Sequence, residues 1–470
     1  MIYDNLDNIH NKKFFAIIVG SGPAGISTAL KLEKKGYDTL ILEAGSTYYQ
    51  SENKQYLDGD VIGDSYNDLK ISRLRQFGGS SANWGGTCAT YKDSDFNDWP
   101  IKKKNLEIYE KETNEILNLR KNFYHSKFSE NLDFFNTQWS NVRFKEKYFR
   151  HIKNSKNIFL SLDTTFCYLN GENGEVKNIT CLKKNKKYII NSIYVILSCG
   201  GIENSRFLLI NKKKNPSLFK SSLPIGKYYM DHPKHDVGKG LIVNKKLKQF
   251  LQKKQINNFP LIECENINLS LNKNHQNNDA ILNSGLTIKL KRTTPYTDIV
   301  RQASCVAPRF IQNIYSSLKE KDVYEFNLSI IQEQAPYSEN KVVLSSNLDP
   351  SNLELVKIHW KISPLLRISA YKIINEFSNI LLNEDLGRLS INDNILEKKN
   401  LNLTLGYHQM GGTRMGTYSH DSVVDKNLLV HGFKNLYING SSVFRTAGFA
   451  WPTFTIVQLA TRLGEHLTEL

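Results

Sequence analysis

The first apolar stretch of the chain follows a polar leader and ends at a glycine-rich turn. Residues 14–19 form a continuous hydrophobic run, β-branched at its end, which predicts a strand buried on both faces. Residues 26–35 then place apolar side chains at helical spacing up to Gly36, and residues 39–42 form a second apolar run that ends at Glu43. The pattern predicts a strand, a turn, a helix and a second strand, which is the order of a βαβ unit.

The turn after the first strand reads Gly20-Ser21-Gly22-Pro23-Ala24-Gly25. We expect Gly20 to allow a tight turn, Gly22 to let the backbone approach a pyrophosphate, and Gly25 to let the helix pack close to the strand. The helix N-terminus attracts phosphates. Glu43 lies about 18 residues after Gly25, where an acid can hydrogen-bond both ribose hydroxyls and would repel a 2′-phosphate. The unit therefore predicts a dinucleotide site, without choosing between NAD and FAD.

Two further glycine-rich segments lie far apart in the chain. The first reads Gly78-Gly79-Ser80-Ser81-Ala82-Asn83-Trp84-Gly85-Gly86, a glycine density that suits a backbone lying against a flat ligand. The second, residues 406–416, contains His408 and precedes an expected strand at 435–439 and an amphipathic helix that opens at Pro452. Strand-like runs at 281–290 and 325–332 are expected between these segments.

Length and charge narrow the class of protein. A chain of 470 residues predicts two or three domains, and 40 % hydrophobic residues exclude a disordered chain. No apolar run approaches the ~18 residues that a membrane span needs, so we expect no transmembrane segment. The net charge of +16 comes from scattered lysines without zinc-finger spacing or an RNP-like strand. A solvated lysine-rich surface therefore explains the charge better than binding to nucleic acid does.

The cysteines predict neither disulfides nor a metal site. Six of them are spread along the chain without a C-x-x-C pair, which argues against a disulfide framework and against structural zinc. The polar residues 1–13 lack the apolar segment of a signal peptide. We therefore expect a cytoplasmic protein in a reducing compartment.

Taken together, these segments resemble the glucose–methanol–choline (GMC) oxidoreductases, especially the branch of pyranose oxidases and sugar or polyol dehydrogenases. The resemblance also rests on residues 226–233, on residues 405–470, and on the segments Cys199-Gly200-Gly201-Ile202-Glu203-Asn204-Ser205-Arg206 and Glu333-Gln334-Ala335-Pro336. It implies an α/β fold with a Rossmann-like FAD-binding domain assembled from residues 1–100, 155–235 and 405–470. An inserted α+β substrate-binding domain would then comprise residues 101–154 and 236–404.

The resemblance also implies an FAD cofactor and a set of site residues. It places His408 opposite the flavin N5 as base or hydrogen-bond partner of a substrate hydroxyl, a role that an imidazole with an ordinary pKa near ~6.5 can fill. It places the backbone of Pro452 and Thr453 near the flavin pyrimidine edge, where a helix N-terminus stabilises negative charge. Further cofactor contacts are implied for Gly78, Gly79, Ser80, Asn83, Trp84, Gly85, Gly200, Asn439 and Gly440.

Three residues depart from the family pattern. Trp451 stands where the family usually has Asn or His as the second member of its catalytic pair, and an indole can donate a hydrogen bond but cannot act as a base. Asn83 stands where pyranose oxidases have the histidine that bonds covalently to flavin, so we expect noncovalent FAD. Arg445 follows Phe444 where a proline is common, and we assign it no role.

The sequence thus predicts an FAD-dependent oxidoreductase that removes a hydride from a CH–OH group, most of all in a sugar or sugar derivative. Its partners would be a small alcohol or carbohydrate and an unidentified electron acceptor. Because of Trp451, two alternatives stay open: a redox-neutral or light-driven lyase or decarboxylase, and a flavin-binding protein without catalysis. NAD binding is a minor alternative that the absorbance spectrum of the purified protein would decide.

Overall fold

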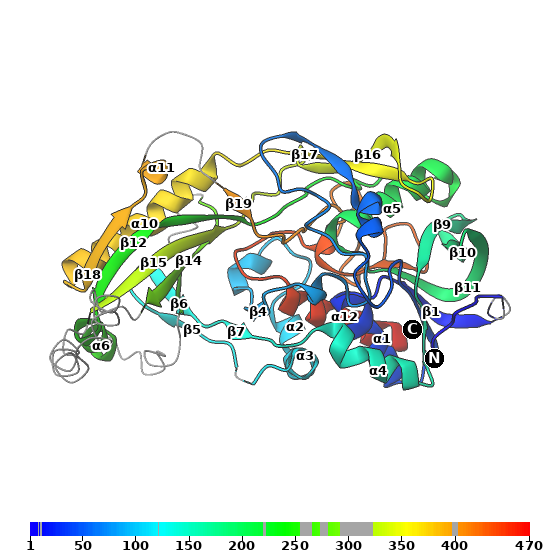
Figure 1. Ribbon diagram of the computed structural model, residues 1–470, viewed down its shortest axis with the longest axis horizontal. Helices are drawn as coiled ribbons and strands as arrows, with labels where there is room; N and C mark the ends of the chain where they lie inside the picture. Colours follow the sequence, from blue (N-terminus) through cyan, green and yellow to red (C-terminus); the bar gives the residue numbers. More distant parts are fainter. Residues whose placement is uncertain are drawn as a thin grey trace, which may run out of the picture.

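The computed structural model describes residues 1–7, 9, 12–120, 122–219, 222–253, 266–272, 281–291, 323–396 and 403–470. The molecule is elongated, with a mixed sheet at one end and a large antiparallel sheet at the other, and both termini lie at the end of the mixed sheet (Figure 1). Among the described residues, no helix combines the length and apolar character that crossing a membrane requires. Cys264 and Cys305 lie outside the described residues, and the other four cysteines carry free thiols.

The mixed sheet confirms the expected βαβ unit. β1 (Lys13–Val19), α1 (Pro23–Glu33) and β2 (Thr39–Leu42) occupy the predicted positions. The strand order is β8-β2-β1-β11-β10-β9, with β20 also on β11. β10 pairs antiparallel with both β11 and β9, and the other pairs are parallel. The additional strands are β8 (Ile158–Ser161), β9 (Thr164–Glu172), β10 (Glu175–Lys183), β11 (Lys186–Leu197) and β20 (Leu436–Ile438).

The two ends of the chain meet on one face of this sheet. The C-terminal helix α12 (Thr453–Thr468) packs against α1, and the Thr28 hydroxyl donates to the Ala460 carbonyl at 3.2 Å. Apolar side chains on both helices and on the parallel strands are buried in one continuous core. The strand and the helix that we expected near the C-terminus are therefore confirmed as parts of the dinucleotide-type domain.

The second sheet is antiparallel and confirms the strands expected at 281–290 and 325–332. Its order is β18-β12-β15-β14-β13-β6-β5, with β19 on β12, and α10 (Leu365–Asn383) packs its apolar side chains against the sheet. The strands are β5 (His125–Lys127), β6 (Leu132–Phe135), β12 (Pro233–Val243), β13 (Asn266–Leu271), β14 (Ser284–Lys291), β15 (Val323–Gln332), β18 (Gly387–Ile391) and β19 (Thr404–Leu405).

Smaller elements connect the two large sheets. One three-stranded sheet is formed by β3 (Gly59–Gly63), β16 (Lys341–Leu348) and β17 (Glu354–Trp360), and it contacts α5 (Gly200–Lys214). A two-stranded ribbon is formed by β4 (Thr87–Cys88) and β7 (Gln138–Trp139). The remaining helices are α2 (Lys104–Glu107), α3 (Glu110–Leu117), α4 (Phe144–Asn154), α6 (Asn244–Lys253) and α11 (Asp393–Leu396). The 3-10 helices are η1 (Ser51–Leu57), η2 (Gly79–Ala82), η3 (Asp93–Phe96), η4 (Pro216–Leu218) and η5 (Ser441–Val443).

The α/β fold class is confirmed, and the exact domain boundaries stay a prediction. Residues 101–154 contribute to both cores: Leu106, Ile116 and Phe144 are buried in the core of the mixed sheet, whereas Leu132 and Phe134 belong to the core of the antiparallel sheet. The predicted inserted segment therefore contains helices that pack on the dinucleotide-type domain as well as two strands of the other sheet.

Candidate active site

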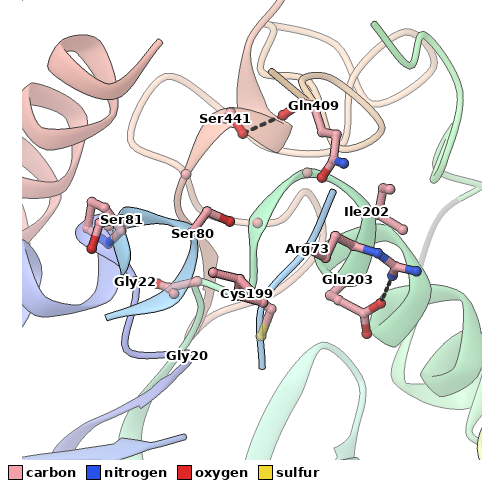
Figure 2. A pocket seen from close by; sticks show the side chains of 18 of the residues that line it. Gly20, Gly22, Arg73, Ser80, Ser81, Cys199, Ile202, Glu203, Gln409 and Ser441 are labelled. Atoms are coloured by element: carbon pink, nitrogen blue, oxygen red, sulfur yellow. Dashed lines mark hydrogen bonds and ion pairs between the residues drawn. The ribbon is translucent and has the colours of Figure 1, made fainter. Parts of the chain in front are cut away.

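A cavity of about 450 Å³ lies where distant stretches of the chain meet. Figure 2 shows the glycine turn, the Ser80 loop and the start of α5 around it, with Gln409 and Ser441 at the top of the view. Most of the predicted site residues line this cavity: Gly20, Gly22, Ala24, Glu43, Gly79, Ser80, Trp84, Gly85, Gly200, His408, Gly440, Trp451, Pro452 and Thr453. The other four predicted contacts, Gly25, Gly78, Asn83 and Asn439, lie outside the lining.

The three glycines of the turn have different surroundings. Gly20 has φ +102°, and a Cβ there would lie 2.6 Å from the Ser198 carbonyl oxygen. A Cβ on Gly25 would lie 2.0 Å from the carbonyl oxygen of Gly20, so this glycine lets α1 pack against the strand. Gly22 is the N-cap of α1, and a Cβ there would meet no atom within 4 Å. Gly22 therefore leaves bare backbone beside the cavity at a helix N-terminus, which favours anions.

Glu43 is held firmly at the end of β2. Its Oε2 accepts hydrogen bonds from the N–H and the hydroxyl of Ser21, at 3.0 and 2.6 Å, and its Oε1 accepts from the Gly45 N–H at 2.8 Å. Burial raises the pKa of this carboxyl, against the hydrogen bonds from Ser21 and Gly45, which lower it. The acid is thus aligned by the turn itself, where it lines the cavity.

The loop at 78–86 packs directly on the glycine turn. The Gly78 N–H donates to the Ser21 hydroxyl at 3.2 Å, and a Cβ on Gly79 would lie 3.0 Å from the Cα of Gly22. Trp84 is fixed by a 2.8 Å hydrogen bond from its Nε1 to the Val142 carbonyl. Gly78 therefore supports the loop from behind the lining, and Asn83 is exposed to solvent.

Asn439 acts from behind the lining. Its Nδ2 donates to the Thr28 hydroxyl at 2.8 Å, and its Oδ1 accepts from the Gly440 N–H at 2.8 Å. The Asn204 side chain donates to the Asn439 carbonyl at 3.0 Å and so ties α5 to the same strand end. These bonds fix Gly440 at the edge of the cavity.

His408 lines the cavity and pairs with a second histidine that the sequence analysis did not identify. The Nδ1 atoms of His408 and His232 lie 2.8 Å apart, and His232 Nε2 lies 3.1 Å from the Ala447 carbonyl oxygen. One Asp231 oxygen accepts the backbone N–H of both histidines, at 2.8 Å from His408 and 2.7 Å from His232. The segment 226–233 carried part of the family resemblance, and it was the only sequence signal for these two residues.

Burial sets the protonation of this cluster. It lowers the pKa of His408 well below 6.5, and the charges of His232 and Lys234 lower it further. It lowers the pKa of His232 to about 4 and raises that of Asp231 to about 6. His408 is therefore neutral near pH 7, as a base must be.

Trp451 lines the cavity directly before α12. Its indole is partly buried against the apolar cluster of Phe135, Ile331 and Phe449, and no acceptor among the described residues takes a hydrogen bond from its Nε1. Pro452 caps α12 and Thr453 begins it, so the cavity faces a helix N-terminus here too. Arg445 lies outside the lining, where its guanidinium pairs with Asp421 at 2.6 Å.

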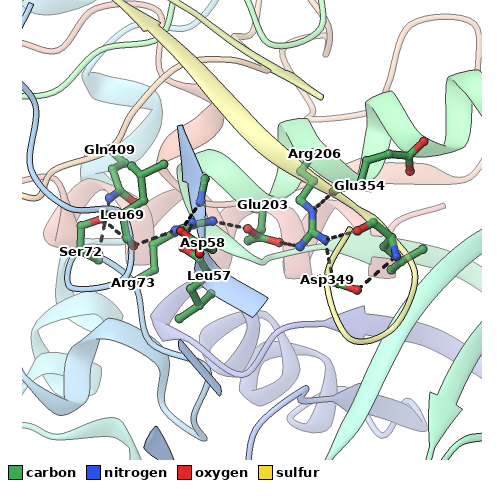
Figure 3. A network of polar contacts seen from close by, with 12 residues as sticks. Leu57, Asp58, Leu69, Ser72, Arg73, Glu203, Arg206, Asp349, Glu354 and Gln409 are labelled. Carbon is green, nitrogen blue, oxygen red and sulfur yellow. Dashed lines mark hydrogen bonds and ion pairs between the residues drawn. The ribbon is translucent and has the colours of Figure 1, made fainter. Parts of the chain in front are cut away.

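A buried chain of charges that sequence reasoning missed borders the cavity (Figure 3). Glu203 on α5 pairs with both Arg73 and Arg206, and Arg206 also reaches Asp349 at 2.6 Å. The arginines lower the pKa of Glu203 against the effect of its burial. The guanidinium groups also donate to backbone carbonyls: Arg73 donates to the Leu57 carbonyl and Arg206 to the Leu353 carbonyl. The charges are mutually satisfied, so their role is to hold the 57–73 segment, α5 and the β16–β17 turn together.

The lining fits a dinucleotide with a flat ring. Cβ atoms on Gly22, Gly85 and Gly200 would all enter open space, so bare backbone faces the cavity at three places. The N-terminus of α1 and the carboxylate of Glu43 suit a pyrophosphate and a ribose, and no Arg or Lys pairs with Glu43 among the described residues. The comparisons with known proteins agree with this fit.

Two parts of the chain match families of known proteins. Residues 336–460 match the family described as GMC oxidoreductase, and residues 18–48 match the NAD(P)-binding Rossmann-like domain. The chain is 25 % identical over 303 residues to 2-methyl-1,2-propanediol dehydrogenase of Mycolicibacterium austroafricanum, a match that covers 63 % of this chain and 52 % of that protein. The chain thus spans about half the length of this relative.

Solved structures share the fold over nearly the whole chain. Pyridoxine 4-oxidase from Mesorbium loti has a TM-score of 0.59 at 13 % identity, with 97 % of this chain and 100 % of that chain covered. An FAD-dependent oxidoreductase from Chaetomium thermophilum has a TM-score of 0.61 at 11 % identity, with 97 % and 99 % covered. The chain therefore has the fold of these two oxidoreductases, and its residues 336–460 match the GMC oxidoreductase family.

Proposed function

We propose that this protein is an FAD-dependent oxidoreductase that removes a hydride from a CH–OH carbon, with His408 taking up the hydroxyl proton. The observation that carries the proposal is that one cavity is lined both by the dinucleotide turn with Glu43 and by His408 with the start of α12. A dinucleotide held by the first set would lie within the same enclosure as a neutral imidazole. The relative that acts on a diol supports the same reaction class.

The FAD would be held noncovalently. Gly22 and the N-terminus of α1 would hold the pyrophosphate, Glu43 the ribose, and the N-terminus of α12 the electron-rich edge of the ring. Asn83, at the position of the covalent histidine in pyranose oxidases, is exposed and its amide is not nucleophilic. When bound, the flavin supplies the hydride acceptor. Precipitation of the protein with acid should therefore release free FAD into the supernatant.

His408 would act as the base at this point of the cavity. Its nitrogen accepts the proton of the substrate hydroxyl as the C–H bond breaks, and its low pKa keeps it unprotonated beforehand. Trp451 can offer a hydrogen-bond donor but no acceptor, and its ring fills space and excludes water. We propose a small alcohol as substrate, with sugars and sugar derivatives as first candidates because of the motif resemblance.

The test is anaerobic reduction of the bound flavin by a panel of sugars, nucleotide sugars, diols and primary alcohols, followed by absorbance. An alcohol that bleaches the flavin supports the proposal, and His408→Ala should slow bleaching by roughly 10²–10⁴-fold. His420→Ala, which changes an exposed histidine outside the cavity lining, is the matched control. Purified protein without flavin absorbance would reject the FAD proposal. An unchanged rate in His408→Ala would reject the base.

Trp451 keeps a second function under consideration. Trp451 supplies no second acid or base at this position. A redox-neutral or light-driven reaction at the flavin would require fewer acid–base groups from the protein than alcohol oxidation does. Such an enzyme would convert its substrate without net oxidation and without an external electron acceptor. Product analysis in the absence of any acceptor separates this function from the first.

A further inference from the structure

Residues 226–233 run alongside residues 404–411, and the pairing brings two histidines together. Met230 and Met410 exchange backbone hydrogen bonds of 2.8 and 2.9 Å, and the Gly406 N–H donates to the His232 carbonyl at 2.8 Å. The pairing continues where β12 meets β19. His232 is thus fixed by backbone bonds beside His408, although 176 residues separate the two in sequence.

Asp231 anchors both histidines. Its Oδ1 accepts the backbone N–H of His232 and of His408, and its Oδ2 accepts the Tyr66 hydroxyl at 2.7 Å. The Tyr66 and Tyr229 hydroxyls lie 2.6 Å apart and extend the network. Asp231 hydrogen-bonds only the backbone N–H groups of the two histidines. The ring nitrogens of both imidazoles therefore hydrogen-bond to other groups.

The partners of His232 determine where its proton lies. Ala447 offers a carbonyl oxygen, which can only accept, so the 3.1 Å contact places the proton of His232 on Nε2. A neutral imidazole carries one N–H, and His232 is neutral because burial lowers its pKa to about 4. Its Nδ1 therefore presents a lone pair toward His408.

The same reasoning fixes the proton of His408. The two Nδ1 atoms are 2.8 Å apart, which is a hydrogen-bond distance, and one of them must donate. Since His232 Nδ1 has only a lone pair, the donor is His408 Nδ1, and the lone pair of His408 lies on Nε2. No described residue hydrogen-bonds that Nε2, and His408 lines the cavity.

Gly406 makes room for this arrangement. A Cβ at position 406 would lie 2.9 Å from His408 Nδ1 and 3.3 Å from the Cβ of His232. The two rings meet nearly at right angles, at 87° and 5.0 Å between centroids. The ring of His408 is therefore held by close packing on one side and by a directed hydrogen bond at Nδ1.

We propose that His232 is a positioning residue that fixes the tautomer of His408, holding its proton on Nδ1 and leaving Nε2 free to accept a proton from a ligand in the cavity. In water the proton of histidine is free to exchange between the two nitrogens, and a base with its proton on the cavity side could not accept another one there. The catalytic meaning rests on the proposed function, whereas the tautomer itself does not.

The test is long-range ¹⁵N–¹H NMR of the full chain labelled at histidine, with the His408 signals assigned from a His408→Gln sample. In the wild-type protein near neutral pH we expect His408 to show a protonated Nδ1 and a bare Nε2, and His232 the reverse. A scalar coupling across the Nδ1–H···Nδ1 bond should connect the two residues. A proton on His408 Nε2 in the wild-type protein overturns the proposal even before any variant is made.

The variant His232→Leu tests the cause. It removes the acceptor, so His408 should shift at least several-fold in population toward the Nε2–H tautomer. The matched control is His235→Leu, which changes a buried histidine three residues further on, in β12, whose ring nitrogens have no partner among the described residues. This variant should leave the tautomer of His408 unchanged. If His232→Leu is folded and the tautomer of His408 is the same as in the wild-type protein, the proposal is overturned. Failure of every alcohol to bleach the flavin overturns the proposed function and leaves the tautomer result standing.

Discussion

Ser21 donates two hydrogen bonds to one oxygen of Glu43, through its hydroxyl at 2.6 Å and its N–H at 3.0 Å. Ser21 thus fixes one carboxylate oxygen of Glu43, which directly follows β2. The Gly45 N–H donates to the other carboxylate oxygen. Because charge-assisted hydrogen bonds are the strong ones, the turn and the acid form a single rigid unit. The phosphate and ribose ends of a dinucleotide would therefore be recognised by one local piece of structure.

Replacing Glu43 by alanine should weaken FAD binding. The change removes the ribose acceptor and releases the Ser21 and Gly45 donors, and the lost charged hydrogen bonds predict an increase in Kd of roughly 10- to 100-fold. Quenching of flavin fluorescence on titration of the apoprotein measures the Kd. Glu33→Gln, in α1 and outside the cavity lining, is the control and should bind FAD as the wild-type protein does. An unchanged Kd in Glu43→Ala would place the ribose elsewhere.

Two glycines of the same turn should respond to alanine in opposite ways. Gly25→Ala puts a Cβ 2.0 Å from the Gly20 carbonyl oxygen, so we expect the free energy of unfolding to fall by about 1–3 kcal/mol or more. Gly22→Ala meets no protein atom within 4 Å, so the apoprotein should fold normally and lose flavin affinity instead. Thermal unfolding of the apoproteins and their flavin content after reconstitution distinguish the two results. A Gly22→Ala protein with full affinity would contradict the position given to the pyrophosphate.

The local part of this site was predictable from pattern and its distant residues from the family resemblance, whereas the pairings between distant residues were not predictable. The turn, α1, β2 and Glu43 follow one another within a few dozen residues, so periodicity and glycine spacing were enough. His232 pairs with His408 across 176 residues, and Arg206 pairs with Asp349 across 143. No local pattern shows which residues these side chains pair with, because the packing of separate strands and helices determines their partners.

Exposure was a second limit on prediction from sequence. From the glycine density, the sequence predicted that the whole loop around Asn83 contacts the ligand. In the structure Asn83 is exposed to solvent and lies outside the lining, whereas Gly85 lines the cavity. Helices α2 to α4 show the same limit, because their buried apolar side chains belong to the core of the mixed sheet, whereas residues 101–154 were expected in the inserted domain. The fold class depends on pattern and was predictable, whereas the direction of single side chains depends on neighbours.

Trp451→Ala should widen the range of alcohols that reach the site. The indole lines the cavity and packs on Phe449 and Ile331, so its removal leaves space that a bulkier substrate can occupy. Rates of anaerobic flavin reduction with alcohols of increasing size measure the effect, and the gain should be largest for the bulkiest. Trp139→Ala, which removes an exposed indole outside the cavity lining, should leave the order of preference as it was. If Trp451→Ala keeps the wild-type order of preference across sizes, Trp451 does not limit access.

Glu333 should make stability fall as the pH rises. Burial, with Asp95 nearby, raises the pKa of this acid from 4.5 to about 7, so the folded protein retains a proton that the unfolded chain releases. Its contribution to stability is complete below pH 4.5 and is lost as the pH rises through about 7. Urea unfolding across this range should show the free energy of unfolding falling in both proteins. The fall should be larger in the wild-type protein than in Glu333→Gln, by on the order of 1–3 kcal/mol. The exposed Glu339→Gln should follow the wild-type curve, and parallel curves for all three proteins would contradict the assignment.

The pH dependence of flavin reduction should follow the low pKa of His408. A base works when it is unprotonated, and burial with the charges of His232 and Lys234 lowers this pKa well below 6.5. At saturating alcohol the rate should therefore stay level as the pH falls through 6.5 and decline only in more acid solution. Asp231 has a pKa of about 6 and bonds the His408 backbone, so its own protonation could also slow the reaction. Asp231→Asn keeps an oxygen acceptor for both N–H groups and removes that titration. If the acid decline persists in this variant, it belongs to His408; if the decline vanishes, the imidazole is not the group whose protonation limits the rate.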